Sequence, residues 1–301
     1  MTASRIVRVG LVQQACGDDR TANLAASERG IREAVRRGAR LVALQELHAS
    51  RYFCQHEDPA AFDLAEPIPG PSTERLGALA AELGIVLIAS LFEKRAAGLY
   101  HNTAVVFDRS ARIAGRYRKT HVPDDPGYYE KFYFAPGDLG IHPIDTSLGR
   151  LGVLVCWDQW YPEAARLMAL AGAEMLVYPT AIGWNPEDDD AERGRQRDAW
   201  ILVQRGHAVA NGLPLLAINR VGFEPDPTGH SAGAQFWGSS FIAGPQGELL
   251  ASAAPDAAEV LVADVDLARS EAVRRWWPFL RDRRIELYGD LALRYRDRSP
   301  E

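Results

Sequence analysis

The chain has 301 residues, of which 47% are hydrophobic and 25% are charged, and its formal net charge is −6 at pH 7. This composition is typical of a soluble globular protein, and the length allows one large or two ordinary domains with a sizeable core. The acidic balance argues against nucleic acid or an anionic membrane as a partner, and it is compatible with a cationic substrate.

No apolar run approaches the roughly 20 residues needed to span a bilayer, and the N-terminal "MTASRIVRVGLVQQ" lacks the apolar region of a secretory signal. Cys16, Cys54 and Cys156 give an odd count without a CxxC spacing, which favours neither a disulfide framework nor a thiolate zinc site. The seven histidines lack an HExxH or other paired ligand spacing. We therefore expect a cytoplasmic protein that uses no metal or organic cofactor.

The first part of the chain alternates short apolar strands with amphipathic helices. Pro71 and Ser72 start one of these helices and Gly84 stops it. We expect strands at 5–14, 39–46, 85–94, 102–108 and 112–120, and helices at 21–38 and 72–83.

A long segment, "HVPDDPGYYEKFYFAPGDLG" from His121 to Gly140, has neither the helical nor the strand period, so we expect an ordered functional loop there. The rest of the chain returns to strands and helices, with strands clustered late. We expect strands at 149–156, 174–180, 213–222, 234–244 and 259–266, and helices at 163–171, 193–211 and in the C-terminal part.

This order of elements favours a layered α/β fold over an open nucleotide-binding sheet. The chain has no GxGxxG, no phosphate-binding loop, no internal repeat and no low-complexity linker. We therefore predict a single domain over residues 1–301.

Three reactive residues stand at the ends of predicted strands. Glu46 closes "LVALQE", Lys119 closes "RIAGRYRK" and Cys156 closes "LGVLVC". Because ligands gather at the carboxyl ends of strands in α/β folds, these side chains are expected to converge in one crevice. A thiol, a carboxylate base and an oxyanion-stabilising ammonium suffice for acyl transfer.

Each of these residues also has an ordinary structural interpretation. A cysteine at the end of a buried strand often serves only as a small apolar side chain. Glu46 and Lys119 are equally compatible with a structural ion pair. Position alone does not decide between these interpretations and catalysis.

The Glu46, Lys119 and Cys156 trio resembles the Glu-Lys-Cys triad of the nitrilase superfamily of carbon–nitrogen hydrolases, and the similarity runs from "VRVGLVQ" to "VADVD". Within it, "KTHVPDDPGYYEKFYFAPGD" and "CWDQWYPEAARLMALAGAEMLVYPTAIGW" look like the N-carbamoylputrescine amidase subfamily. The resemblance implies a four-layer α-β-β-α sandwich that forms homo-oligomers. Because the C-terminal stretch is aromatic and basic, we expect the C-terminal extension, about residues 268–301, to lie at a subunit interface.

By motif, the resemblance makes Glu46 the general base and acid, Lys119 the oxyanion lysine and Cys156 the nucleophile, with Glu130 as a second glutamate near the lysine. A structural alternative for Glu130 is a loop carboxylate paired with Lys131 or a neighbouring basic group. The implied substrate is a small cationic ureido compound, N-carbamoylputrescine, hydrolysed through a carbamoyl thioester.

Such a substrate requires apolar walls along its spacer and a carboxylate at its ammonium end. The candidates are Tyr52, Tyr128, Trp157, Trp160 and Trp184 for the walls, and Asp125 and Glu187 for the ammonium.

Other activities remain open from the residues alone. An enzyme for ureidopropionate or N-carbamoyl amino acids requires a donor for a carboxylate, and Arg51, Arg195 and Arg197 are available. An aliphatic amide or nitrile requires only the same triad. A non-catalytic scaffold is disfavoured because all three triad residues are present, and a thiol sensor role for Cys156 is a further alternative.

Overall fold

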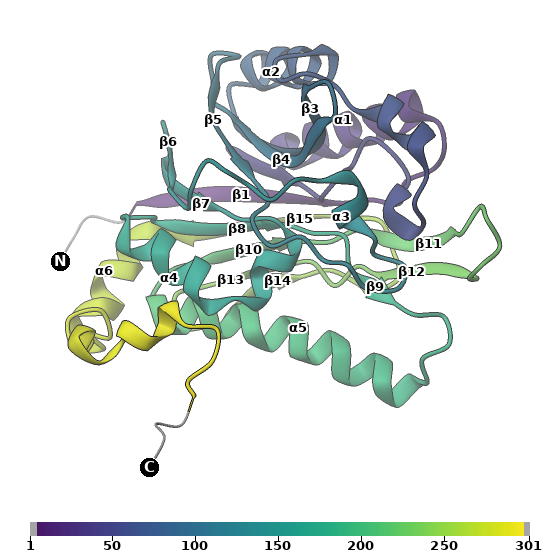
Figure 1. The fold of residues 1–301 in the computed structure, drawn as a ribbon. Coiled ribbons are helices and arrows are strands. Elements are labelled where there is room, and N and C mark those ends of the chain that lie inside the picture. The colour runs from purple at the N-terminus through teal and green to yellow at the C-terminus, as the bar shows by residue number, and fades with distance from the viewer. Residues whose placement is uncertain (1–4, 298–301) are drawn as a thin grey trace.

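The computed structural model describes residues 5–297, so the two ends of the predicted domain, 1–4 and 298–301, lie outside the described residues. Two six-stranded mixed sheets face each other, and helices cover both outer faces (Figure 1). The prediction of a four-layer α-β-β-α sandwich is confirmed.

The first sheet has the order β15-β1-β2-β3-β4-β5, with β1, β2 and β3 parallel and the other pairs antiparallel. Its parallel centre places the end of β2 at the same edge as the site described below. The strands are β1 (Ile6–Gln13), β2 (Leu41–Leu44), β3 (Val86–Ala96), β4 (Leu99–Phe107), β5 (Ile113–Arg118) and β15 (Glu259–Asp266).

The second sheet has the order β14-β13-β10-β8-β7-β6, and its centre, β10, β8 and β7, is again parallel. Strand β8 is buried along its whole length, as expected for a strand covered on both faces. The strands are β6 (Ile144–Thr146), β7 (Gly149–Val153), β8 (Met175–Pro179), β10 (Leu215–Ile218), β13 (Phe241–Ala243) and β14 (Leu249–Ser252).

Helices α1 and α2 pack on the first sheet, and α4 and α5 lie over the second (Figure 1). Asp19 caps the start of α1, and α2 ends at Gly84 in the left-handed region, where a Cβ would be strained. The helices are α1 (Arg20–Arg36), α2 (Pro71–Leu83), α3 (Glu130–Tyr133), α4 (Pro162–Leu170), α5 (Asp190–Asn211) and α6 (Leu267–Trp276).

The main core lies between the two sheets, where side chains such as Leu11 and Ile88 meet Leu176 and Leu216. A second apolar layer lies between the first sheet and its helices. Because each sheet is covered on both faces, the strands hold their ends rigidly. No helix in residues 5–297 is long and apolar enough to cross a membrane.

Some sequence-based boundaries were wrong. The segment 213–222 forms two strands, β10 and β11 (Val221–Pro225), and 234–244 likewise divides into β12 (Gly233–Trp237) and β13. Strands β11 and β12 join β9 (Gly183–Trp184) in a third, small sheet. The break before β11 carries Asn219 and Arg220, two buried polar residues that the apolar pattern did not distinguish from strand.

Candidate active site

The ends of three strands and one short helix bring four reactive side chains together. Glu46 follows β2, Lys119 follows β5, and Cys156 follows β7 at the start of the 3-10 helix η3 (Cys156–Trp160). Glu130 is the first residue of α3. The predicted loop 121–140 therefore contains a helical turn that delivers a carboxylate. All four side chains are buried.

Lys119 lies at the centre of this group. Its Nζ donates to Glu46 Oε1 at 2.9 Å and to Glu130 Oε2 at 2.6 Å, and all three side chains are fully inaccessible to solvent. The structure thus pairs Glu130 with Lys119 and not with Lys131. Tyr52 donates its hydroxyl to Glu130 Oε1 at 2.7 Å, which fixes the second oxygen of that carboxylate.

Glu46 has one occupied and one free oxygen. Asn102 Nδ2 donates to Oε1 at 2.6 Å, beside the bond from Lys119. Within residues 5–297, Oε2 is buried and accepts no hydrogen bond. A buried carboxylate oxygen of this kind is a ready acceptor for a proton.

The buried charges in this group act strongly on one another. Burial by itself lowers the pKa of Lys119, but the carboxylates of Glu130 and Glu46 outweigh it and raise that pKa well above its usual value. Burial raises the pKa of Glu130 to about 7, against the lowering effect of Lys119. Lys119 therefore remains an ammonium, which is the form that stabilises an oxyanion.

Cys156 sits on a strained turn. Its φ of 45° lies in the left-handed region, which a side chain rarely adopts, and such strain often marks functional residues. The Sγ atom lies 3.8 Å from the carbonyl oxygen of Ala181. Burial raises the pKa of the thiol well above its usual value, the Glu46 charge raises it further, and Lys119 opposes both. The resting sulfur is therefore a neutral thiol that requires a base.

The thiol and Glu130 line a cavity of about 590 Å³. Of the predicted substrate-binding residues, four line this cavity: Asp125, Tyr128, Trp157 and Trp160. The other three lie elsewhere. Tyr52 is buried behind the wall with its ring 5.4 Å from that of Tyr128. Trp184 packs against Trp237, and Glu187 is exposed outside the lining.

Sequence reasoning named Arg195 as an alternative donor but missed the other residues at the start of α5 that line this cavity. Asp188, which precedes the helix, and Glu192, Arg195 and Gln196 on its first turns all line the cavity. Arg195 donates to Glu192 Oε2 at 2.5 Å. The spacing of three residues between Glu192 and Arg195, which places both on one face of a helix, was the available signal in the sequence. It was missed because the helix begins at Asp190, before the predicted 193.

The three candidate arginines therefore differ in position. Arg195 lines the cavity, whereas Arg51 pairs with Asp18 at the surface and Arg197 does not belong to the lining. No cluster of three or more His, Cys, Asp or Glu side chains in the described part of the chain is arranged to hold a metal ion.

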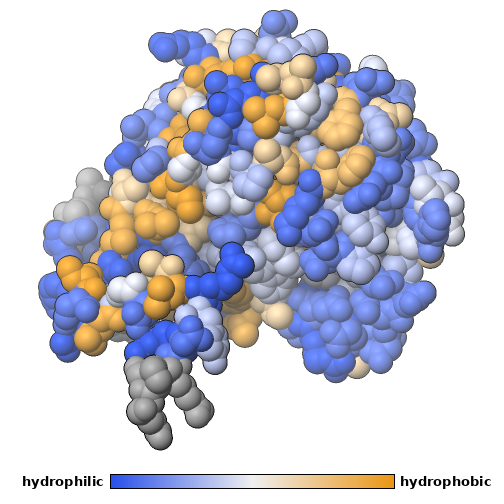
Figure 2. Space-filling view, viewed as in Figure 1, coloured by the Kyte–Doolittle hydropathy of each residue, from blue (hydrophilic) through white to orange (hydrophobic). Residues whose placement is uncertain are grey.

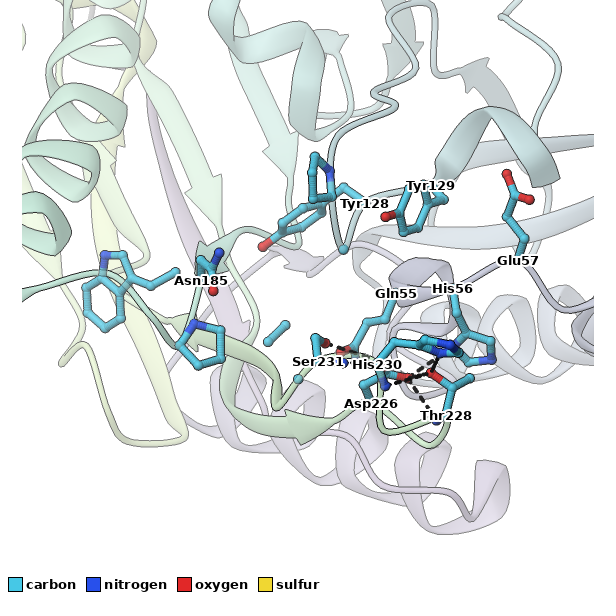
Figure 3. Close-up of a pocket in the computed structure, with 16 residues that line it drawn as sticks. Gln55, His56, Glu57, Tyr128, Tyr129, Asn185, Asp226, Thr228, His230 and Ser231 are labelled. Atoms are coloured by element: carbon cyan, nitrogen blue, oxygen red, sulfur yellow. Dashed lines mark hydrogen bonds and ion pairs between the residues drawn. The ribbon is translucent and has the colours of Figure 1, made fainter.

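A second cavity, of about 680 Å³, adjoins the first (Figure 3). Pro126, Tyr128 and Asn185 line both cavities and so form the wall between them. Figure 3 shows Tyr128 and Tyr129 on one side of the second cavity and a hydrogen-bonded cluster with Asp226 and Thr228 on the other. Its described lining contains none of the four reactive residues, so we assign the chemistry to the first cavity.

Comparison with known proteins gives consistent matches over nearly the whole chain. The carbon–nitrogen hydrolase family matches residues 8–275. N-carbamoylputrescine amidase of Solanum lycopersicum is 47% identical over 95% of this chain and 94% of its own. Citrullinase of Francisella tularensis is 41% identical over 96% and 99% of the two chains. A crystal structure of a carbon–nitrogen hydrolase from Helicobacter pylori G27 superposes with a TM-score of 0.94 at 55% identity, over 97% of this chain and all of that one.

Proposed function

Because the chain belongs to the carbon–nitrogen hydrolase family, we propose that it hydrolyses N-carbamoylputrescine to putrescine, carbon dioxide and ammonia. One observation carries the assignment: the Cys156 thiol and several carboxylates share one cavity. The thiol accounts for the carbon–nitrogen cleavage, and the carboxylates suit a substrate whose other end is an ammonium.

In the first half of the reaction, Glu46 Oε2 takes the proton of Cys156 as the sulfur attacks the ureido carbon. The sulfur–carbon bond forms and the carbonyl oxygen becomes an oxyanion. Lys119 and the main-chain N–H of Trp157, in the first turn of η3, stabilise this charge. Glu46 then returns the proton to the terminal nitrogen, which leaves as ammonia. The product is a carbamoyl thioester on Cys156.

In the second half, Glu46 removes a proton from a water molecule that attacks the thioester carbon. The sulfur–carbon bond breaks, Cys156 regains its proton, and the released carbamate decomposes to putrescine and carbon dioxide. One carboxylate thus acts as base and acid in both halves. The scheme requires no cofactor.

Glu130 serves this cycle through Lys119. Its carboxylate accepts from Nζ at 2.6 Å, and Tyr52 holds its other oxygen. A lysine held between two carboxylates keeps both its charge and its position when the thiol changes charge. We therefore assign Glu130 to the positioning of the oxyanion lysine.

The distal ammonium of the substrate is assigned to the acidic side of the cavity. Asp125, Asp188 and Glu192 are available there, and Glu187 is not. Trp157, Trp160 and Tyr128 supply apolar surface for the four-carbon spacer. An exposed carboxylate binds an ammonium weakly, so several partners are needed for affinity.

A ureido amino acid is the second candidate substrate, because Arg195 lines the same cavity. Its guanidinium can form two hydrogen bonds with a carboxylate. The 41% identity to the Francisella citrullinase is consistent with this class of substrate. In the structure Arg195 is paired with Glu192, so a carboxylate would have to replace that partner.

We further propose that the enzyme forms homo-oligomers through its C-terminal extension. Hydrophobic side chains gather at the lower left of the molecule, where the C-terminal segment lies (Figures 1 and 2). Within this segment the side chains of Trp276, Ile285 and Leu291 are 78%, 69% and 66% exposed. Exposed apolar surface of this extent is typical of an interface. We place the enzyme in the cytoplasm, where reductants keep thiols such as Cys156 free.

Ammonia release from N-carbamoylputrescine, N-carbamoyl-β-alanine and citrulline at equal concentration tests this proposal, with Cys156→Ala as the blank. We expect the cationic substrate to be hydrolysed most efficiently and the blank to be inactive. Preference for citrulline would favour the role of Arg195. No ammonia from any of the three substrates would contradict the proposed activity.

A further inference from the structure

A second buried ion pair lies behind the catalytic group, and the reaction scheme does not use it. Arg220 and Glu224, at the start and near the end of the β11 segment, are joined at 2.7 Å, and their side chains are 0% and 2% exposed. The guanidinium lies 5.4 Å from the centre of the Phe236 ring. Removing two charges from water is costly, and this cost can exceed the attraction between them. A contribution to stability therefore does not by itself explain why the pair is present.

Arg220 binds the main chain that carries the catalytic base. Its Nη2 donates to the carbonyl oxygens of Glu46 and Leu47 at 3.1 and 2.8 Å, and its Nη1 donates to the carbonyl of Ser50 at 2.9 Å. Leu47 has a φ of 48°, in the left-handed region. A strained turn persists only where its surroundings hold it, and Arg220 supplies three of the contacts that hold this one.

Glu224 reaches the second glutamate through Tyr52. Its Oε2 accepts from the main-chain N–H of Tyr52 at 2.6 Å, while its Oε1 accepts from Arg220. The hydroxyl of the same tyrosine donates to Glu130 at 2.7 Å. One ion pair is therefore connected to Glu46 on one side and to Glu130 on the other.

We propose that Arg220 and Glu224 are positioning residues that hold both glutamates in place around Lys119. The inference rests on the proposed roles of Glu46 and Glu130. The side-chain hydrogen bonds of the pair in residues 5–297 do not include Lys119 or a residue that lines the cavity with Cys156. The pair therefore acts through the main chain and through Tyr52. A guanidinium suits this task because its planar fork serves several oxygens at once, which an ammonium cannot do.

The test compares two conservative variants with a matched control. Arg220→Lys keeps the charge but loses the fork, and Glu224→Gln keeps the shape but loses the charge. The control is Glu93→Gln, which removes the carboxylate of another buried pair, Glu93 with Arg118, whose side chains are 2% and 4% exposed. All three variants weaken a buried ion pair, but only the Arg220–Glu224 pair is hydrogen-bonded directly to the main chain of Glu46 and of Tyr52.

Two rates are measured per mole of folded protein. For ammonia release, we expect kcat to fall about tenfold to a hundredfold in Arg220→Lys and Glu224→Gln, with KM within about threefold, because small displacements of catalytic groups are costly. For Glu93→Gln, kcat is expected to remain within about threefold of the wild type. Tyr52→Phe combined with Glu224→Gln is expected to lose less than the product of the two single losses.

The second rate is the alkylation of Cys156 by iodoacetamide, with Cys156→Ala as the blank. It requires the base but no ureido substrate, so it distinguishes a failure of this inference from a failure of the proposed substrate. We expect alkylation to slow about tenfold in both variants of the pair. If the wild-type enzyme is alkylated but releases no ammonia, the proposed substrate is wrong and the positioning role is still tested by the alkylation rates.

Three outcomes would overturn the positioning role. The first is that folded Arg220→Lys and Glu224→Gln keep both rates within about threefold of the wild type. The second is that Glu93→Gln slows as much as they do. The third is that kcat falls in both variants while the alkylation rate of Cys156 stays within about threefold of the wild type, which would mean that the base is still held in place.

Discussion

The catalytic group and the acidic side of its cavity place charge in opposite surroundings. Lys119, Glu46 and Glu130 are fully buried at the ends of strands and hold one another at hydrogen-bond distance. Glu192 and Arg195, on the first turns of α5, have side chains that are 40% and 67% exposed. Glu130 and the two α5 residues line the same cavity, but water screens only the charges on α5.

The difference separates chemistry from selectivity. Charges in a dry interior interact strongly and stay fixed, which is what an oxyanion and a proton transfer require. Charges at the solvent-exposed N-terminus of a helix interact weakly and can change partners. Recognition of the charged end of a substrate requires such an exchange of partners. We therefore expect changes in the interior to act on kcat and changes at α5 to act on KM.

The largest effect is expected from Cys156→Ala. Without the sulfur no thioester forms, and kcat should fall by about 10⁴-fold or more. The measurement is ammonia release at saturating substrate. Thermal unfolding is the control, because losing one small buried atom should change stability little compared with activity. Substantial residual turnover would contradict a covalent intermediate.

Lys119→Met tests the interior charges next. The change leaves two buried carboxylates without their cation, so we expect a loss of about 3–5 kcal/mol in the free energy of unfolding. The oxyanion also loses a donor, and kcat should fall about 10²- to 10³-fold. Urea unfolding and ammonia release measure the two effects. Lys131→Met, on an exposed neighbour, is the matched control and should change neither.

Glu130→Gln tests the same group through pH. Because the pKa of Glu130 is raised to about 7 from an ordinary 4.5, the unfolded chain loses this proton before the folded chain does. Stability therefore falls as pH rises from about 4.5 to 7, by on the order of 3 kcal/mol for this residue.

The variant lacks this ionisation, so its stability relative to the wild type should increase between pH 5 and pH 8. Urea unfolding at the two pH values gives the comparison. A relative change in the opposite direction would mean that the Glu130 pKa is lowered, and hence that Lys119 outweighs burial.

The smallest effect is expected at α5. Asp188→Asn and Glu192→Gln should each raise KM for the cationic substrate about three- to tenfold, with kcat within twofold, because exposed ion pairs are weak. Glu187→Gln is the matched control, since its side chain lies outside the cavity lining. Added salt should raise the wild-type KM more than that of either variant. A large fall in kcat in either variant would contradict the expectation that the α5 charges act on KM alone.

The sequence alone determined the layered fold and most of its strands. Apolar runs such as the one before Cys156 are strong signals, because a strand covered on both faces must be apolar throughout. The same runs end in Glu46, Lys119 and Cys156, so the strand-end rule and the family motif pointed to one place. Short edge strands such as β6 and β14 gave no such signal, since few of their residues are buried.

Only the tertiary structure decided which side chains complete the site. Glu187 and Asp188 are neighbours in an acidic run, but only Asp188 faces the cavity, because the direction of a side chain depends on where α5 starts. The sequence pattern predicts that Arg220 belongs to a strand. In the structure its side chain binds the turn at Glu46, and the two residues are 174 positions apart in the chain. Contacts over that distance are set by the packing of the two sheets, and no local period in the sequence records them.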